Sequence, residues 1–191
     1  MKKIVLFASG SGSNAENIIR FFAQRAHGEV VAVFCNNPHA KVIDRAENLG
    51  VPVVVFDKEA LHGESVLLKL RAFGPDLIVL AGFLWMFPAH IIAAFPNQII
   101  NIHPALLPKY GGKGMYGMHV HRAIREANET ETGISIHYVD PHYDEGDLIF
   151  QAKVPVEAHD TPEQIAQKVQ QLEYDHFPKV IEQLLLGVNK K

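Results

Sequence analysis

The chain has 191 residues, of which 48% are hydrophobic and 20% are charged, and its 18 basic and 21 acidic residues give a net charge of −3. This composition predicts one globular domain over residues 1–191, and the charge gives no electrostatic case for a nucleic-acid partner. The single cysteine excludes an internal disulfide framework, no apolar run could span a membrane, and the N-terminus reads as a strand instead of a signal peptide. We therefore expect a cytoplasmic protein that binds small molecules.

The chain opens with a strand joined to a helix by a glycine-rich loop. Residues 3–8 form a continuous apolar run, typical of a buried strand in a parallel sheet, and the loop S-G-S-G-S-N occupies residues 9–14. Apolar spacing predicts a helix over 15–25, which a capping box formed by Ser13 and Glu16 would start. Such a loop offers backbone N–H groups, a helix dipole and serine hydroxyls to an anion, so it predicts a phosphate site. A tight turn without a ligand is the alternative.

The same loop also matches a dinucleotide-binding pattern, G-x-G-x-x-A, at Gly10, Gly12 and Ala15. The next strand, predicted at 30–34, ends in Cys-Asn-Asn and lacks the acidic residue that holds a ribose in that motif. A single phosphate group therefore ranks above NAD as the ligand of this loop.

Strands and helices alternate along the rest of the chain. Pro178 should kink or interrupt the long final helix, which a T-x-x-Q capping box at Thr161 starts. The order predicts an α/β fold, a Rossmann-like doubly wound, mostly parallel sheet with an antiparallel C-terminal strand pair. The expected strands are 53–56, 77–80, 99–103, 132–139 and 148–154, and the expected helices are 40–49, 64–73, a short helix after Pro88, and 119–128.

Two polar residues stand at the carboxyl end of the strand that Pro104 terminates. Asn101 and His103 are two residues apart, so their side chains share one face of that strand. The pair combines a fixed hydrogen-bond donor with a group that titrates near neutral pH. An N-x-H sequence by itself more often marks a loop histidine beside a turn asparagine, so the surroundings must decide.

Two further loops should border this strand end. The run A-G-F-L-W-M-F at 81–87 could form a wall for a flat aromatic ligand, although Trp85 and Met86 fit a core position about equally well. Residues 109–117 hold four glycines in nine residues, which suits either a moving lid or a plain connector.

Two chemistries can be assembled from these residues. A metal site on His119 and His121 with a carboxylate from the acidic loop 140–147 is a weak match, because no H-E-x-x-H motif is present. The stronger reading is acyl transfer without a covalent intermediate, in which an asparagine N–H and an imidazolium hold the oxyanion and a carboxylate takes the proton of an attacking amine. We therefore expect no metal.

Three further motifs follow, G-I-S-I-H at 133–137, D-E-G at 144–146 and V-Q-x-x-E at 169–173. Taken together with the motifs above, they resemble those of the phosphoribosylglycinamide formyltransferases, a folate-dependent family. The resemblance implies the formyltransferase fold and transfer of the formyl group of 10-formyltetrahydrofolate to the amine of glycinamide ribonucleotide in de novo purine (IMP) biosynthesis, by a monomer or homodimer. It covers nearly the whole chain and rests on S-G-S-G-S-N at 9–14, A-G-F at 81–83, N-I-H-P-A-L-L-P at 101–108, G-I-S-I-H at 133–137, D-E-G at 144–146 and V-Q-x-x-E at 169–173.

The resemblance also implies a role for each matching residue. In the catalytic set, Asn101 and His103 would polarise the formyl group and Asp144 would assist proton transfer through water. Ser135 and His137 would support this geometry from behind. The remaining implied contacts are Gly12, Ser13, Asn14, Leu84, Gln170 and Glu173 for the ribonucleotide, and Trp85, Met86, Phe87, Ile92, Asp140 and Asp144 for the folate.

The chain departs from the family pattern at two places. Trp85 stands where the family often has an arginine, which predicts a more apolar folate pocket. The segment around 112–118 is also longer than usual, which leaves the contacts of this loop open. Three alternatives are a formyltetrahydrofolate hydrolase, a methionyl-tRNA formyltransferase, which would need a second basic domain, and a nucleotide sensor without catalysis.

Overall fold

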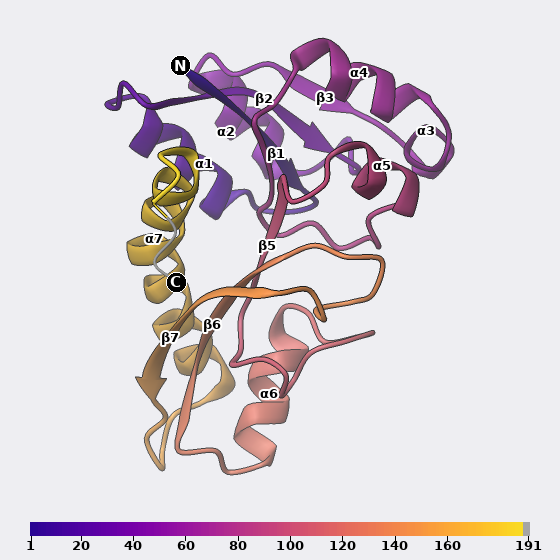
Figure 1. The fold of residues 1–191 in the computed structure, drawn as a ribbon. Coiled ribbons are helices and arrows are strands. Elements are labelled where there is room, and N and C mark those ends of the chain that lie inside the picture. Colours follow the sequence, from indigo (N-terminus) through magenta and orange to yellow (C-terminus); the bar gives the residue numbers. More distant parts are fainter. Residues whose placement is uncertain (189–191) are drawn as a thin grey trace.

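The computed structural model describes residues 1–188 and contains a seven-stranded sheet with helices on both faces (Figure 1). The strand order is β3-β2-β1-β4-β5-β6-β7, in which β5 pairs with β6 and β6 with β7 in antiparallel fashion while the other pairs are parallel. This arrangement confirms the predicted fold class. The strands are β1 (Lys2–Ala8), β2 (Gly28–Cys35), β3 (Val53–Val55), β4 (Leu77–Leu80), β5 (Ile99–His103), β6 (Glu131–Tyr138) and β7 (Leu148–Pro155).

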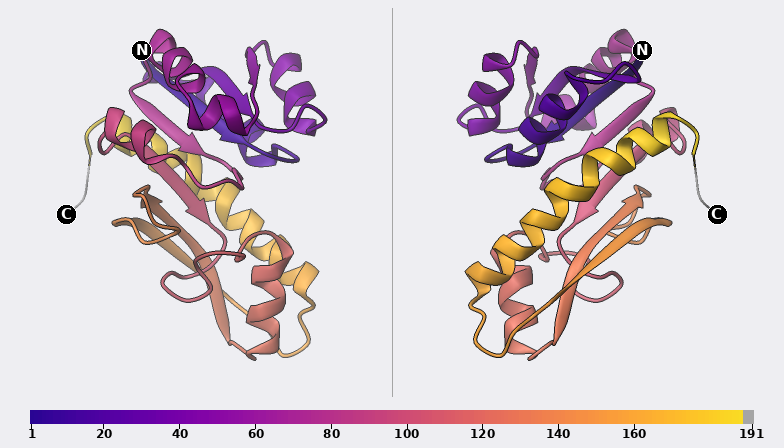
Figure 2. Two further views of the ribbon diagram at one scale, coloured as in Figure 1. Left: turned by 90° about the vertical axis from the view of Figure 1, so that its right-hand side faces the viewer. Right: turned by 90° about the vertical axis from the view of Figure 1, so that its left-hand side faces the viewer.

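The helices divide between the two faces of the sheet. One face packs against α1, α2, α6 and α7, and the other against α3, α4 and α5. Figure 2 shows α7 running obliquely along its face of the sheet, with α6 near its amino-terminal end. The helices are α1 (Ser13–Phe22), α2 (Lys41–Asn48), α3 (Lys58–His62), α4 (Ser65–Phe73), α5 (Ala89–Ala94), α6 (Met118–Glu126) and α7 (Pro162–Leu185).

The central strand β1 explains why the core has two halves. Ile4 and Leu6 point into one hydrophobic cluster and Val5 and Phe7 into the other, and all four side chains are fully buried. Side chains alternate between the faces of a strand, so a strand that is apolar at every position needs a helical layer on each side. The continuous apolar run in the sequence therefore corresponds to a strand covered on both faces.

The strand order fixes where a ligand can bind. The connection from β1 leads to β2 on one side of it, whereas β4 pairs with its other side, so the order reverses between β1 and β4. In open α/β sheets the crevice for a ligand forms at such a switch point, outside the carboxyl ends of the strands. The loop 9–12 after β1 and the loop 81–88 after β4 meet at this point, where Ser9 N–H donates to the Gly82 carbonyl at 3.0 Å.

The start of α1 differs from the prediction. Gly12 occupies the N-cap position with a left-handed φ of 72°, and no side chain caps the helix, so the predicted Ser13/Glu16 capping box is wrong. Glu16 instead forms ion pairs with Arg20 and Arg45, which draw its carboxylate away from the helix terminus. The helix also ends at Phe22, three residues earlier than predicted.

The last helix, α7, is not interrupted at Pro178. It runs without a break over 24 residues, from a capping box at Thr161 that the sequence predicted and the structure confirms. Proline lacks the N–H that would bond to the carbonyl four residues earlier, here that of Tyr174. The side chain of Asn17 donates to this carbonyl at 3.1 Å, so the contact between α1 and α7 replaces the missing backbone bond.

The short helix α3 was not predicted. Its N-cap is Asp57, whose carboxylate accepts a hydrogen bond from the Ala60 N–H at 2.8 Å. An aspartate directly before helix-forming residues is a recognisable start signal, although a helix of five residues has almost no apolar periodicity.

Within residues 1–188, no helix is both long enough and apolar enough to cross a membrane.

Candidate active site

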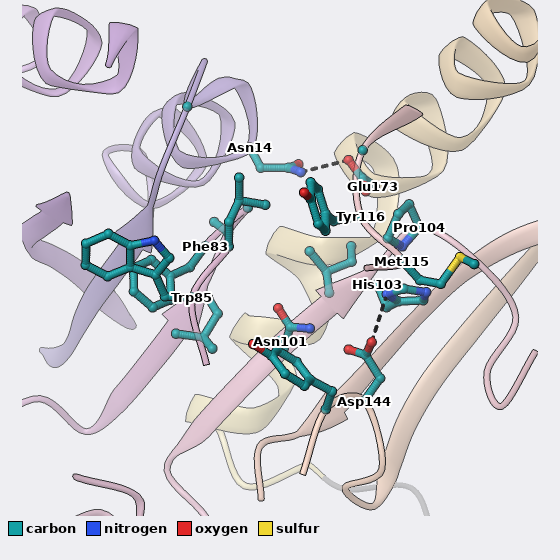
Figure 3. A pocket seen from close by; sticks show the side chains of 18 of the residues that line it. Asn14, Phe83, Trp85, Asn101, His103, Pro104, Met115, Tyr116, Asp144 and Glu173 are labelled. Carbon is teal, nitrogen blue, oxygen red and sulfur yellow. Dashed lines mark hydrogen bonds and ion pairs between the residues drawn. The ribbon is translucent and has the colours of Figure 1, made fainter. Parts of the chain in front are cut away.

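A cavity of about 870 Å³ opens where β1, β4 and β5 end (Figure 3). Its walls come from segments far apart in the chain, because the carboxyl ends of parallel strands meet at one edge of the sheet. The lining segments are the glycine-rich loop 10–14, the run 80–87, residues 101–104 of β5 and the loop after it, residues 112–118, residues 137–144, and the inner side of α7 at 166–173.

His103 lies at the centre of the cavity and is buried at 3% exposure. Its Nε2 is 2.7 Å from the Tyr110 carbonyl oxygen, and its Nδ1 is 3.5 Å from Asp144 Oδ2. A carbonyl can only accept, so Nε2 carries the hydrogen of the neutral imidazole and Nδ1 carries the lone pair. Nδ1 and the carboxylate are then two acceptors that face each other and can share an incoming proton.

Asp144 is held in place from three directions. Its Oδ2 accepts the Gly112 N–H at 3.0 Å, its Oδ1 lies 3.5 Å from His137 Nε2, and its backbone has a left-handed φ of 56°. Positive φ is uncommon outside glycine but is tolerated by aspartate. The fold therefore turns the chain sharply at this residue and directs the carboxylate at the two imidazoles.

Asn101 and His137 face each other across the β5–β6 pair. They are register partners, and Asn101 Nδ2 lies 3.2 Å from His137 Nε2. The Nδ1 of His137 donates to the Tyr138 carbonyl at 2.8 Å, so its Nε2 accepts from Asn101 when the ring is neutral and donates to Asp144 when it is protonated. Binding one amide hydrogen to His137 orients the amide and leaves its second N–H available to a ligand.

Ser135 braces the segment that follows β5. Its hydroxyl donates to the Ala105 carbonyl at 2.7 Å and accepts from the Leu107 N–H at 2.9 Å, and the Gln151 amide also donates to it at 2.8 Å. Ser135 and Gln151 are register partners on β6 and β7. These bonds fix the chain after His103, so Ser135 acts on the site without reaching the cavity.

The electrostatics keep the central pair ready for proton transfer. Burial lowers the pKa of His103, outweighing the Asp144 carboxylate and the Tyr110 carbonyl, which raise it. Burial acts to raise the pKa of Asp144, but the hydrogen bond with His137, the charge of His103 and the Gly112 N–H together hold it below its usual value. At neutral pH the site therefore contains an ionised carboxylate beside an uncharged imidazole.

The loop 10–14 and α7 form one end of the cavity. Asn14 Nδ2 donates to Glu173 Oε2 at 2.8 Å, and Gln170 Nε2 donates to Ser13 Oγ at 3.4 Å. Burial raises the pKa of Glu173 to about 7, against a smaller lowering by Asn14. The Asn14 Oδ1 atom is buried without a hydrogen-bond partner. Polar groups are therefore gathered here and only partly satisfied.

Gly12 allows a close contact between this loop and α2 that the sequence did not predict. A Cβ at Gly12 would come within 2.4 Å of the Val42 side chain, whereas a Cβ at Gly10 would meet nothing within 4 Å. The absent side chain at Gly12 thus lets the loop approach α2, and the positive φ there also favours glycine.

Aromatic and apolar side chains form the opposite end of the cavity. Trp85 stacks edge-on against Phe83 and Phe56, and the Lys58 ammonium lies 5.4 Å from its ring centroid. Leu84, Met86, Phe87 and Asp140 also line the cavity, whereas Ile92 packs against the core cluster of α3 to α5 and is not among the lining residues.

The strap, which is the segment of residues 111–117, lines the cavity from Gly112 onward. Gly112 binds Asp144 through its N–H, while Met115 packs against the hydrophobic core and also lines the cavity. Tyr110, just before the strap, has a left-handed φ of 56° and supplies the carbonyl that binds His103. No sequence signal marked the Tyr110 contact, because it depends on how the chain turns after β5.

His121 on α6 is a further cavity residue that the motifs did not single out for this role. It is 6% exposed, and its Nδ1 has no hydrogen-bond partner. Within residues 1–188, no group of three or more His, Cys, Asp or Glu side chains is arranged to hold a metal ion.

The fold and the cavity define an α/β protein with a ligand-sized cavity at the switch point of a doubly wound sheet. A family model described as formyl transferase matches residues 2–181. A phosphoribosylglycinamide formyltransferase of Bacillus subtilis is 36% identical, over 100% of this chain and 98% of its own length. The chain thus belongs to the formyl transferase family, among its phosphoribosylglycinamide formyltransferases.

Two further similarities agree with this assignment. The chloroplastic phosphoribosylglycinamide formyltransferase of Arabidopsis thaliana is 38% identical over 94% of this chain, which spans 64% of that relative's length. The crystal structure of phosphoribosylglycinamide formyltransferase from Anaplasma phagocytophilum superimposes with a TM-score of 0.89 at 30% identity, covering 97% of this chain and 88% of the other.

Proposed function

We propose that this chain transfers the formyl group of 10-formyltetrahydrofolate to the amine of glycinamide ribonucleotide, a step of purine biosynthesis. One observation carries the proposal: Asn101, His103 and Asp144 converge in a cavity that has a glycine-rich loop at one end and an aromatic wall at the other. Family membership supports the same reaction and the same co-substrate. A phosphate at the loop and a pterin at the wall would bring amine and formyl group together at His103.

The reaction begins when the amine nitrogen bonds to the formyl carbon. The electron pair of the carbonyl moves onto oxygen, where the free N–H of Asn101 stabilises the negative charge. As this charge develops, His103 takes up a proton on Nδ1, because its Nε2 already donates to the Tyr110 carbonyl. The imidazolium then stabilises the oxyanion from a second direction.

Proton transfer completes the exchange. The amine loses one proton, which passes through water and Asp144 to His103 Nδ1, and the imidazolium gives this same proton through water to folate N10 as the bond from N10 to the formyl carbon breaks. Asp144 suits this role because its lowered pKa keeps it ionised at neutral pH and because it lies 3.5 Å from His103 Nδ1. Protons balance, and no covalent enzyme intermediate forms.

The binding residues divide between the two ends. We assign the phosphate to Gly12, Ser13 and Asn14, the ribose to Gln170 and Glu173, and the glycinamide side to Leu84, all of which line the cavity. The folate falls to Trp85, Met86 and Phe87 together with the backbone of 140–144. Ile92 would act only from behind this wall.

The test is formyl transfer from 10-formyltetrahydrofolate to glycinamide ribonucleotide, with free formate measured in the same reaction. The proposal predicts formylated ribonucleotide in step with tetrahydrofolate and almost no formate. Formate without formylated product would identify a hydrolase instead. Tight ribonucleotide binding with no turnover would identify a sensor.

Three properties of the whole protein stay predictions. We expect one domain that acts as a monomer or homodimer in the cytoplasm. The buried Cys35 thiol suits a reducing compartment. Fractionation and sedimentation of the native protein would test the location and the assembly state.

A further inference from the structure

The charges that line the cavity do not match the charge of the proposed ribonucleotide. Its phosphate carries a charge near −2, while Asp140, Asp144 and Glu173 also line the cavity. In the part of the chain that the structure describes, Lys113 is the one lysine or arginine among the lining residues. A dianion bound here would therefore meet three carboxyl groups and a single ammonium group.

Two arginines on the helices beside the loop are already engaged. Arg20 on α1 and Arg45 on α2 both pair with Glu16. These two arginines and Lys41, the first residue of α2, lie outside the set of residues that line the cavity. The loop itself offers only N–H groups, hydroxyls and the helix dipole, which amounts to about half a positive charge. Full charge balance has to come from another segment.

Lys113 sits on the strap between two anchored residues. On one side Gly112 binds Asp144, and on the other Met115 packs against the core. The flanking Gly112 and Gly114 have φ of 92° and 87°, and a Cβ at either would meet nothing within 4 Å. The lysine is thus exposed on a short glycine-flanked segment, and the anchored residues Gly112 and Met115 on its two sides line the cavity.

The strap also reaches toward the phosphate end. Figure 3 shows the Tyr116 side chain directed to the end of the cavity where Asn14 and Glu173 lie, and Met115 near His103. His119 packs edge-on against the Tyr116 ring, with 5.5 Å between ring centroids. The strap therefore extends from the catalytic carboxylate to the phosphate end, and Lys113 lies within this span.

We propose that Lys113 binds the phosphate of the ribonucleotide and supplies the positive charge that the glycine-rich loop lacks. This inference rests on the proposed function and adds to it a specificity residue from the strap. Because the same strap binds Asp144 through Gly112, phosphate binding by Lys113 would also hold the strap over the catalytic centre. Lys113 is a binding residue in this account and takes no part in proton transfer.

The test compares Lys113→Met with Lys109→Met by isothermal titration. Both substitutions remove one ammonium group, but Lys109 pairs with Glu129 and does not line the cavity. The ligands are glycinamide ribonucleotide, the same compound without its phosphate, and 10-formyltetrahydrofolate. We expect Lys113→Met to weaken ribonucleotide binding by about 10- to 100-fold, the range for loss of one bond to a charged group, with little effect on the other ligands. Lys109→Met should bind all three normally.

Each other outcome has a defined meaning. Unchanged ribonucleotide binding by a folded Lys113→Met overturns the inference. A loss of folate binding alone also overturns it, because Lys113 would then bind the carboxylates of the folate's glutamate tail. An equal loss for the ribonucleotide and its dephosphorylated form also overturns it. Recovery of binding in Lys113→Arg supports the charge as the cause. The proposed function fails separately, if the wild-type protein binds no ribonucleotide or transfers no formyl group.

Discussion

The catalytic centre of the cavity, around His103, and the phosphate end, at the loop 10–14 and α7, are built differently. Around His103 the polar groups are already bonded, with Nε2 on the Tyr110 carbonyl, Asn101 on His137 and Asp144 on Gly112. At the phosphate end Asn14 has a buried oxygen without a partner, and a pKa raised to about 7 marks Glu173 as poorly solvated. The centre is thus preorganised for chemistry, whereas the phosphate end keeps polar atoms whose hydrogen-bonding capacity is unfilled.

The difference explains how one small domain serves two demands. Stabilising a transient oxyanion requires donors that do not move during the reaction, so they are fixed by strand pairing and by a second layer of hydrogen bonds. Binding and releasing a charged substrate requires donors that are exposed when it is absent. Four sets of substitutions test this contrast, with expected effects that decrease from the first to the last.

Removing the oxyanion donors should have the largest effect. We expect Asn101→Ala or His103→Ala to lower kcat by about 100-fold or more, because each removes stabilisation of charge that develops in the transition state. His90→Ala is a matched control, since that imidazole bonds to the Gly63 carbonyl outside the cavity. Steady-state kinetics measures kcat, and circular dichroism checks that the variants are folded. Near-normal kcat in both site variants would contradict the role of Asn101 and His103 as oxyanion donors.

Asp144→Asn tests the proton acceptor. The lowered pKa keeps the Asp144 carboxylate ionised across the neutral range, so its loss should reduce kcat by about 100-fold at every pH from about 6 to 8. The measurement is the kcat profile over that range. If the ratio of variant kcat to wild-type kcat rose toward 1 at one end of this pH range, Asp144 would titrate near neutral pH, which would contradict its lowered pKa.

The two loop glycines form a matched pair for the phosphate end. Gly12→Ala should destabilise the protein by about 2–5 kcal/mol, because the new Cβ meets Val42 and the backbone holds a positive φ. Gly10→Ala has open space and should fold normally. Denaturant unfolding would measure both. Equal stability of the two variants would show that the loop can shift away from α2.

Glu173→Gln should give the smallest effect, through the pH dependence of stability. The folded-state pKa of about 7 lies above the ordinary 4.5, so the folded protein retains this proton longer than the unfolded chain does. The free energy of unfolding of the wild type should therefore fall relative to the variant between pH 4.5 and about 7, by about 1–3 kcal/mol in total. Thermal unfolding at several pH values measures this, and parallel curves would contradict the raised pKa.

The sequence was sufficient for what depends on local pattern. The strand ending at His103, the antiparallel pair β6–β7 and the Thr161 capping box were all predicted, because apolar alternation, a terminating proline and capping residues act over a few positions. The convergence of Asn101 and His103 in one cavity followed from their shared strand face. Asp144 entered the catalytic set only through the resemblance.

What the sequence missed depends on contacts between distant segments. Glu16 matched a capping box but pairs with Arg45 on another helix. Pro178 matched a helix break, but α7 continues through it, and Asn17 bonds to the carbonyl that the proline leaves without a backbone partner. The Tyr110 carbonyl and the left-handed turn at Asp144 position His103, yet neither has a pattern of its own. Predictions from local sequence failed at positions where a hydrogen bond or ion pair to a distant segment determines the structure.

The most direct test of the central contrast compares His103→Ala with Ser13→Ala by single-turnover formyl transfer and by ribonucleotide titration. If the centre is built for chemistry and the loop for binding, His103→Ala should lose about 100-fold in the single-turnover rate and keep the wild-type Kd. Ser13→Ala should weaken the ribonucleotide Kd by about tenfold and keep the rate at saturating substrate. Loss of both rate and affinity in both variants would contradict this division of the cavity.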